Sequence, residues 1–235
     1  MDNSVFSEKQ NGIKGWPASE RPREKLFRSG AEALSDADLV ALLLRNGLKG
    51  KDAVALGREL IGCFGSLRAL LAAGAAELQA VKGLGSAKVA SLLAVSEMAK
   101  RQLREEICGK NYARDPEAVV LYLTASLRDL KKEIFKVLFL NKANRILEEK
   151  DLFHGTVDET AVHPREVVKA ALELHATAVI LVHNHPSGRI QPSPEDREIT
   201  RRIQLACRTV GIKVLDHIIV GDNQYFSFNE HQLID

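Results

Sequence analysis

Apolar residues recur at helical spacing along the first part of the chain, from about residue 23 to residue 104. Three of these stretches end in glycine, which readily takes the left-handed conformation that ends a helix: LSDADLVALLLRNG, DAVALGRELIGCFG and SLRALLAAG. In the first, Ser35 is placed to cap the helix and Gly47 to end it. The pattern predicts a small all-α bundle over residues 23–110, after a polar arm over residues 1–22 that is expected to be extended and anchored by Trp16.

The pattern changes after the polar, turn-rich segment EEICGKNYARDPEA, where we expect the domain boundary. A helix is expected from Asp115 to about residue 127, with Pro116 at its first position. Runs with strand character then alternate with helical ones. Strands are predicted at residues 133–141, 145–153, 155–162, 177–185, 213–220 and 224–229, and helices at residues 163–176 and 193–211. Residues 113–235 therefore form an α/β or α+β domain, whose last two strands pair as a hairpin.

Composition and net charge do not identify the kind of binding partner. The chain carries 33 Lys and Arg against 31 Asp and Glu, and a net charge of +2 is too small to indicate a nucleic-acid partner by itself. Residues 1–110 have a charge of +4 (17 basic against 13 acidic) and residues 111–235 have −2 (16 against 18), so a polyanion would contact the first part. Cys63, Cys108 and Cys207 have no CxxC spacing, which indicates a reduced cytosol and packing in the core. No apolar run is long enough to cross a bilayer, so we expect a soluble cytoplasmic protein without a membrane partner.

Two histidines and an aspartate stand out in the stretch VHNHPSGRIQPSPED. His183 and His185 lie two residues apart at the end of an apolar strand, so both rings project from one face of it. A Gly/Pro turn follows, and Asp196 falls in the first turn of the next helix. Two imidazoles and one carboxylate, with a fourth position left for water, are a ligand set of catalytic zinc, which activates that water and polarises a carbonyl.

A purely structural interpretation of the same residues is also open. Ser193 and Asp196 have the spacing of a capping box, which begins many helices. A lone His-x-His pair often only packs. The two interpretations of Ser193 are compatible, because a capped helix start would hold Asp196 rigidly for coordination. Four residue types at fixed offsets favour the metal site.

The spacing His183-x-His185-Pro186, six residues, then Ser193-x-x-Asp196 resembles the JAMM (MPN+) metalloprotease motif. The surrounding segments HPREVVKAALELHATAVILVHNHPSG and GWPASERPREKLFRSGAEALSDADLVALLLRNG resemble the bacterial RadC-like proteins. This resemblance extends over nearly the whole chain and is highly specific.

The resemblance implies a fold and a cofactor. Residues 113–235 would form a three-layer α+β domain with a mixed sheet flanked by helices, after the small all-α bundle. One Zn²⁺ per chain would be held by His183, His185 and Asp196. Asn184 departs from the Ser or Thr that the eukaryotic deubiquitinating members usually carry. It lies on the opposite strand face from the ligands, so the metal site is unaffected.

The same resemblance implies a glutamate on an early strand as general base, hydrogen-bonded to the zinc water. Glu133, at the start of EIFKVLFLN, takes that place in the order of elements, and Glu166 in HPRE is the alternative. By the same analogy the Ser193 hydroxyl helps to stabilise the tetrahedral oxyanion. His217 in LDHIIVG is interpreted as a packed core residue, with lining of the site or a hydrogen bond to a site residue as the alternative.

The stretch LQAVKGLGSAKVASLLAV resembles a helix-hairpin-helix element, whose glycine turn presents backbone N–H groups to a DNA phosphate. The residues that would contact DNA are Lys82, Gly83, Gly85, Ser86 and Lys88. Such binding would depend on salt and not on base sequence. Val89 departs from the alanine usual in the motif, and the same GLG also suits a plain helix–helix turn, so both interpretations stay open.

Three functions from different classes follow. The leading one is a zinc-dependent hydrolase of the metallopeptidase or isopeptidase type, acting on an unknown protein or peptide and carrying a DNA-binding N-terminal domain. The RadC name invokes DNA repair, but no repair chemistry follows from these residues. A nuclease using His183, Asn184 and His185 as His-Asn-His is disfavoured, because that motif spreads its residues along a ββα unit. The third is a non-enzymatic DNA-binding or accessory protein with a zinc site, and in each case an exposed edge strand would allow a homodimer.

Overall fold

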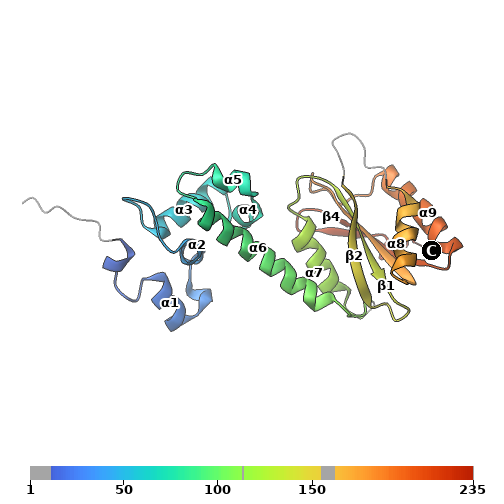
Figure 1. Ribbon diagram of the computed structural model, residues 1–235, viewed down its shortest axis with the longest axis horizontal. Helices are drawn as coiled ribbons and strands as arrows, with labels where there is room; N and C mark the ends of the chain where they lie inside the picture. Colours follow the sequence, from blue (N-terminus) through green and yellow to red (C-terminus); the bar gives the residue numbers. More distant parts are fainter. Residues whose placement is uncertain (1–11, 113, 155–161, 235) are drawn as a thin grey trace, which may run out of the picture. The chain divides into compact units, whose positions relative to one another are not determined.

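The computed structural model describes residues 12–112, 114–154 and 162–234 (Figure 1). Its contacts divide the chain into two compact units, Met1–Met98 and Ala99–Asp235. Helix α6, Ser86–Ile107, continues across this division, so the turn-rich segment expected at the boundary comes after the division. No helix in the described ranges is long and apolar enough to cross a membrane.

The first unit is built mainly from helices. In its described part they are η1 (Ile13–Gly15), α1 (Pro22–Ser29), η2 (Ala31–Ala33), α2 (Asp36–Leu44), α3 (Ala53–Phe64), α4 (Leu67–Ala72), α5 (Ala75–Gln79) and the start of α6. Their apolar faces meet in a core that includes Leu44, Leu56, Leu60, Leu70 and Leu92, all at most 2% exposed. The predicted all-α bundle is confirmed.

The sequence predicts the start of α2 correctly but not its end. Ser35 caps the helix as predicted, because its Oγ accepts a hydrogen bond from the Asp38 N–H (3.2 Å) and the Asp38 carboxylate accepts one from the Ser35 N–H (3.1 Å). The predicted stop at Gly47 is wrong, since α2 already ends at Leu44. Gly47 instead permits a close backbone approach, because a Cβ there would lie 2.0 Å from the Lys51 carbonyl oxygen.

The other predictions for this unit are likewise correct in part. Gly65 ends α3 with a left-handed φ of 86°, as predicted. Gly74, expected to end α4, is the N-cap of α5, since α4 ends at Ala72. Ile13 and Trp16 pack against buried residues of α2 and α3. The arm is therefore anchored at Trp16 as expected, but its described part contains a 3-10 turn and is not simply extended.

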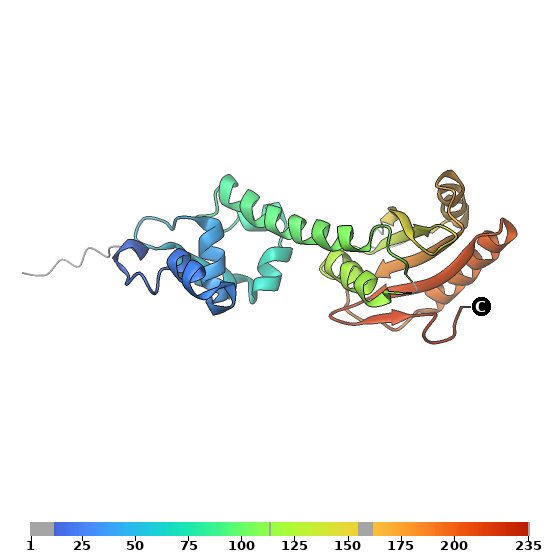
Figure 2. The ribbon, with the colours of Figure 1, turned by 90° about the horizontal axis from the view of Figure 1, so that it is seen from below.

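The second unit contains a mixed sheet with helices on both faces (Figure 1 and Figure 2). Its described elements after α6 are α7 (Pro116–Leu127), β1 (Ile134–Leu140), β2 (Ile146–His154), α8 (Pro164–Glu173), β3 (Ala178–Asn184), α9 (Pro194–Thr209), β4 (Lys213–Val220) and β5 (Tyr225–Ser227). The strand order is β2-β1-β3-β4-β5, with β3 and β4 parallel and the other neighbours antiparallel. The α+β class and the β4–β5 hairpin are confirmed. Residues 155–161 of the strand predicted at 155–162 lie outside the described residues.

Alternating side chains on the central strands produce a core on each face of the sheet. Towards α8 and α9, the packed residues include Val137, Phe139, Val167, Val179, Leu181 and Ile203. Towards α7, they include Val119, Leu123, Leu138, Leu140, Ile180 and Val182. β3 lies between β1 and β4 with both faces covered, and all its residues are buried, as its unbroken apolar sequence predicts.

The cysteines differ in exposure. Cys207 is buried in α9, but Cys63 and Cys108 are exposed. The expectation that all three pack in the core is wrong for these two. Cys63 lies in the last turn of α3 and Cys108 directly follows α6, so each stands near a helix end where few neighbours cover it.

A buried carboxylate ties β4 to the segments around it. Asp216 is 1% exposed and accepts hydrogen bonds from Tyr112 Oη (2.8 Å), Ser227 Oγ (2.7 Å), and the N–H groups of His217 (2.7 Å) and Asn229 (3.0 Å). Burial, and then the Asp216 charge, raise the pKa of Tyr112, so its hydroxyl stays a donor. These bonds compensate for the loss of hydration of the buried charge. Asp216 thereby holds β5 and the segment after α6 against β4.

Asp216→Ala is expected to lower the free energy of unfolding by about 3 kcal/mol, because it leaves buried donors without an acceptor. Tyr112→Phe removes one of those donors and should lower it by about 1 kcal/mol. Urea titration followed by circular dichroism measures both changes. Equal stability of Asp216→Ala and the unsubstituted chain would show that the network contributes nothing.

Candidate metal centre

The candidate metal ligands lie where the C-terminal end of β3 meets the start of α9. His183 is the second-last residue of β3, and His185 directly follows the strand. α9 begins with Ser193 as its N-cap and Pro194 at its first position. Asp196 is therefore the third residue of α9, and its carboxylate lies against the two imidazoles.

The ligand atoms of these three residues converge. His183 Nε2 lies 2.9 Å from His185 Nε2 and 3.1 Å from Asp196 Oδ1, and His185 Nε2 lies 3.5 Å from Asp196 Oδ2. His183 is 1% exposed and Asp196 9%, whereas His185 is half-buried and reaches solvent. Among the described residues, this is the group of His, Cys, Asp and Glu side chains whose atoms are close enough to share an ion.

The hydrogen bonds that His185 and Asp196 make away from the centre show which of their atoms face it with a lone pair. His185 Nδ1 lies 2.8 Å from the Arg189 carbonyl oxygen, which can only accept, so Nδ1 carries the proton and Nε2 of the neutral ring has the lone pair. Asp196 Oδ2 accepts hydrogen bonds from the Ser193 N–H and Oγ–H, each at 2.7 Å. Oδ1 is left to face His183. Lone pairs this close repel one another unless a cation or a proton lies between them.

The spacing fits a metal ion. Two ligand atoms bound about 2.1 Å from one tetrahedral ion lie roughly 3.4 Å apart. The separations of His183 Nε2 from His185 Nε2 and from Asp196 Oδ1, 2.9 and 3.1 Å, are close to that value, and one ligand atom of each residue lies within 4.8 Å of the others. Two imidazole nitrogens and one carboxylate oxygen suit a first-row divalent ion and leave a coordination position for water. The cluster is therefore able to hold a metal.

The groups of the cluster affect one another's ionisation. Burial acts to raise the pKa of Asp196, but the adjoining His183, His185 and Ser193 side chains hold it below its ordinary value. The adjoining Asp196 carboxylate raises the pKa of His185 against the opposing effect of burial, and the bond to Arg189 adds to the rise. The aspartate is therefore ionised at neutral pH, as a metal ligand requires.

Two buried residues behind the cluster complete its surroundings. His183 Nδ1 lies 2.8 Å from His217 Nε2, and His217 Nδ1 lies 2.6 Å from Thr200 Oγ1. His217 is 0% exposed, and burial, followed by the nearby His183, holds its pKa well below the ordinary value. The expectation that His217 packs in the core is correct, and the alternative of a hydrogen bond to a site residue is also realised. Sequence reasoning missed Thr200, because its place beside His217 depends on how α9 packs on β4.

Glu133 directly precedes β1, where the sheet register leads towards His185. β1 and β3 pair with Phe135 opposite His183. Continuing that antiparallel register by two residues brings Glu133 opposite His185 and onto the same face of the sheet. The negative charge of Glu133 also contributes to the raised pKa of His185. Glu133 is therefore the candidate base that the structure places near the cluster.

Asn184 holds the segment that carries Glu133. Its Oδ1 accepts a hydrogen bond from the Ile134 N–H (2.8 Å), and its Nδ2 donates to the Lys132 carbonyl oxygen (3.1 Å). These contacts lie on either side of Glu133 in sequence. Asn184 is 1% exposed and faces away from the histidine rings, as strand alternation predicts.

The other two candidate groups have different surroundings. Glu166 lies in the first turn of α8 and forms an ion pair with Arg165 (3.2 Å). Ser193 Oγ accepts a hydrogen bond from the Asp196 N–H (3.0 Å) and donates its single proton to Asp196 Oδ2. Contact between Ser193 and a substrate oxyanion would require that hydroxyl to turn away from Asp196. The capping box is present, and it holds the ligand carboxylate in place.

Comparison with known proteins agrees with this arrangement. The RadC-like JAB domain family matches residues 113–233, and the UPF0758 N-terminal family matches residues 13–90. The chain belongs to the UPF0758 family of RadC-like proteins. The resemblance to RadC-like proteins is thereby confirmed, and the His183, His185 and Asp196 cluster lies within the JAB domain.

Relatives within the UPF0758 family share about half of their residues with this chain over almost its full length. The UPF0758 protein of Stutzerimonas stutzeri is 51% identical over 219 residues, covering 93% of this chain and 98% of the relative. Those of Thioalkalivibrio sulfidiphilus and Nitrosococcus oceani are each 50% identical over 222 residues, covering 94% of this chain and 99% of each relative. Both units of the chain therefore belong to the family's shared architecture.

The residues expected to contact DNA lie at the start of α6 and in the turn before it. Lys82, Gly85 and Ser86 are exposed. Gly83 has a φ of 100° and lies against Leu48, where a Cβ would be 2.4 Å from the leucine side chain. This close contact is a structural reason for the glycine, as the plain-turn interpretation requires.

Lys88 has an internal role. Its Nζ donates to the carbonyl oxygens of Gly47 and Gly83, each at 3.3 Å, and so ties the α2–α3 loop to the turn before α6. The charge is still half-exposed, but part of its hydrogen-bonding capacity is used within the unit. The first N–H groups of a helix have no partner within it, and exposed Lys82 adds a positive charge close by in the sequence, so the start of α6 suits an anion.

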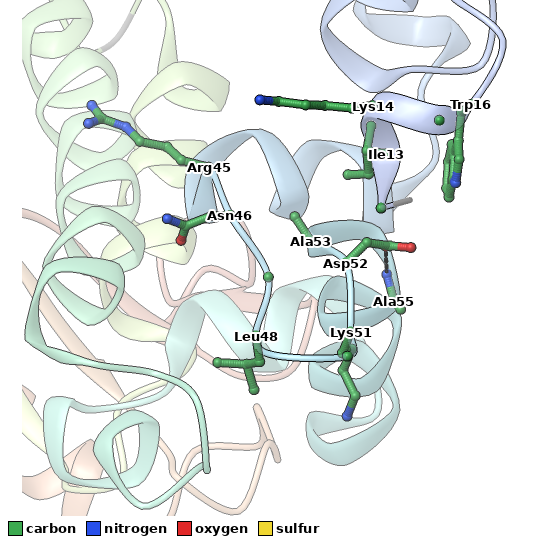
Figure 3. Close-up of a pocket in the computed structure, with 14 residues that line it drawn as sticks. Ile13, Lys14, Trp16, Arg45, Asn46, Leu48, Lys51, Asp52, Ala53 and Ala55 are labelled. Atoms are coloured by element: carbon green, nitrogen blue, oxygen red, sulfur yellow. Dashed lines mark hydrogen bonds between the residues drawn. The ribbon is translucent and has the colours of Figure 1, made fainter. Parts of the chain in front are cut away.

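A groove of about 1060 Å³ lies between η1 and the α2–α3 loop (Figure 3). Lys14 and Arg45 extend to the same side of it, and Asn46 and the Gly47 backbone line its wall. Arg45 has a φ of 64°, and the Asn46 N–H donates to the Leu44 carbonyl oxygen (2.8 Å), which closes a three-residue turn that is rare for a residue with a side chain. The turn places the Arg45 guanidinium at the groove.

The full-length chain purified without added chelator is expected to contain about one zinc ion, and His183→Ala and Asp196→Ala are each expected to lose it, because two remaining ligands bind too weakly. His175→Asn is the matched control: His175 is exposed, outside the cluster, and has a φ of 51° that asparagine tolerates. Inductively coupled plasma mass spectrometry with protein quantification gives the stoichiometry. Folded, unsubstituted protein without metal after incubation with zinc would contradict the assignment.

Proposed function

We propose that this protein is a zinc-dependent hydrolase that cleaves a peptide or isopeptide bond. The observation that carries the proposal is the convergence of the His183, His185 and Asp196 ligand atoms, with Glu133 directly before β1 and close enough for its charge to raise the pKa of His185. A hydrolase of this kind needs an open coordination position and a carboxylate base beside it. The His185 side chain, which is 17% exposed, gives the centre access to solvent and substrate.

The ligands in this proposal have distinct tasks. His183 and His185 would bind zinc through Nε2 and Asp196 through Oδ1, while Ser193 keeps Oδ2 occupied and the carboxylate oriented. When bound, zinc supplies Lewis acidity that makes a water molecule nucleophilic at neutral pH and polarises the scissile carbonyl. The buried side of the cluster, formed by His183 and Asp196, excludes bulk water and strengthens these electrostatic effects.

Glu133 would act first as general base and then as general acid. Its carboxylate accepts a proton from the attacking water and delivers it to the leaving amine, which needs it to depart. Asn184 supports this role by fixing the backbone on both sides of Glu133 through Ile134 and Lys132. A base held in this way is already oriented, so it loses less conformational freedom when the substrate binds.

A nuclease of the His-Asn-His type is a poor alternative. Asn184 would have to work together with His183 and His185 in that mechanism. Its side chain instead faces the opposite side of β3 and is engaged by Ile134 and Lys132. The proposal of a hydrolase acting on an amide bond is therefore preferred, with the substrate defined so far only by that bond.

In zinc-loaded protein, Glu133→Gln is expected to retain the metal and reduce amide hydrolysis by about 10²- to 10⁴-fold, because the proton acceptor is lost. Glu166→Gln, the matched control, should retain activity, since Glu166 pairs with Arg165. A pool of peptides that includes lysine-linked isopeptides, followed by mass spectrometry, measures cleavage. Equal cleavage by Glu133→Gln and the unsubstituted protein would exclude Glu133 as the base. Absence of any cleavage by zinc-loaded protein would favour an accessory role.

We further propose that the first unit binds DNA through phosphate contacts. Two features support this: the exposed residues Lys82, Gly85 and Ser86 at the start of α6, and the groove with Lys14 and Arg45. Helix starts and unpaired cations bind phosphate without reading base sequence. Lys88 ties the turn to the groove loop, so both features belong to one rigid part of this unit.

Lys82→Glu is expected to weaken binding of duplex DNA and to reduce the slope of log affinity against log salt by about one, because one phosphate contact is lost. Lys169→Glu, on α8 in the second unit, is the control and should leave affinity unchanged. Fluorescence anisotropy of a labelled duplex at several salt concentrations gives both quantities. Salt-independent binding, or none, would refute the proposal.

A further inference from the structure

A chain of short hydrogen bonds connects the backbone of α9 to one of the candidate ligands. It runs from the Asp196 carbonyl oxygen to Thr200 Oγ1 (2.5 Å), then to His217 Nδ1 (2.6 Å), and from His217 Nε2 to His183 Nδ1 (2.8 Å). Thr200 is 2% exposed, His217 0% and His183 1%. Every group in the chain is therefore shielded from water, and each proton must be assigned within it.

The direction of the protons follows from the first bond. Two oxygens only 2.5 Å apart must share a hydrogen, and a backbone carbonyl has none to give, so Thr200 donates to Asp196. A hydroxyl has one proton, so Thr200 Oγ1 can only accept from His217 Nδ1–H. A fully buried His217 is neutral, because a buried charge is costly, and its Nε2 therefore accepts from His183 Nδ1–H. The lone pair of His183 is left on Nε2, which faces His185 and Asp196.

We propose that Thr200 and His217 are positioning residues that fix the tautomer of His183, so that its Nε2 lone pair faces the metal centre. This inference rests on the proposed zinc hydrolase and identifies what sets its ligand geometry. A ligand imidazole usually donates its second N–H to a carbonyl or carboxylate. Here the acceptor is a second imidazole, which could donate instead of accept, so Thr200 is needed to decide the direction.

The packing around His217 keeps its ring in the orientation that the chain of hydrogen bonds needs. The ring stacks on Phe228 (centroid separation 4.7 Å, interplanar angle 26°) and lies against Phe135 (5.7 Å, 60°). Phe135 also stacks on His183 (6.1 Å, 9°). A partial rotation of either imidazole would disturb these contacts, and a complete flip would put carbon atoms where the hydrogen-bonding nitrogens lie.

Thr200→Val keeps the shape of the side chain and removes the hydroxyl. His217 then loses the acceptor for Nδ1–H, and its other tautomer, with the proton on Nε2, can donate to His183 and force a proton onto the ligand nitrogen. Zinc affinity is expected to fall about 10- to 100-fold, the usual effect of losing such support. Thr200→Ser keeps the hydroxyl and should bind zinc as the unsubstituted chain does.

Thr209→Val is the matched control. Thr209 is also in α9, and its Oγ1 donates to the Leu205 carbonyl oxygen (2.9 Å), but it is exposed and away from the cluster. Competition titration of zinc with a chromophoric chelator, on the full chain of each variant, gives the dissociation constants. Thermal unfolding of the metal-free variants separates a loss of fold from a loss of affinity. Equal affinity of Thr200→Val and Thr209→Val would overturn the proposal.

Nitrogen-15 NMR of the histidine rings reads the tautomers directly. Long-range ¹H–¹⁵N correlations in the full chain are expected to show His217 protonated on Nδ1 with Nε2 as acceptor, and His183 protonated on Nδ1. A His217 protonated on Nε2 would overturn the proposal, with or without zinc. If the unsubstituted chain binds no zinc, the proposed function fails, and the same spectra of the metal-free chain still decide the direction of the hydrogen bonds.

Discussion

The second unit depends on holding three electron-rich atoms in contact. His183 Nε2, His185 Nε2 and an Asp196 carboxylate oxygen lie within 3.5 Å of a neighbour in the cluster, where like partial charges repel. Such an arrangement is stable only if a cation lies between the atoms or other contacts hold them in place. The surrounding hydrogen bonds to Arg189, Ser193 and His217 hold each group from its far side.

The architecture explains how those contacts are held. β3 lies in the centre of the sheet with both faces covered, so β1 and β4 hold it from both sides. The capping box of α9 fixes the first turn, where Asp196 lies. Neighbouring residues of β4 contribute on opposite faces: Asp216 anchors β5 and Tyr112, while His217 reaches His183. One strand therefore serves both the stability of the unit and the geometry of the centre.

Much of this was predictable because local rules determine it. The unbroken apolar run of β3, the two-residue spacing of His183 and His185, and the Ser193 cap are each encoded within a few residues. The convergence of the ligands also followed, since a strand end and the next helix start must meet across a short turn. The family resemblance supplied the three layers and Glu133 as a candidate base.

The remaining features depend on contacts between segments distant in sequence. Thr200 has no signal of its own, and its role arises only because α9 packs on β4 beside His217. Gly47 has the pattern of a helix stop, yet it serves an approach to Lys51 that depends on how the loop folds back. That Glu133 lies towards His185 depends on how β1 pairs with β3, and the sequence of a single strand does not give that register.

X-ray absorption spectroscopy at the zinc edge, on the full chain loaded with one equivalent of zinc, tests the central claim most directly. The account predicts two imidazole nitrogens, one carboxylate oxygen and one water, with nitrogen and oxygen ligands about 2.0–2.2 Å from the metal. His185→Ala is expected to lose this spectrum, because the two remaining ligands bind zinc too weakly. Sulfur ligands at about 2.3 Å, or a spectrum unchanged in that variant, would place the metal elsewhere and contradict the account.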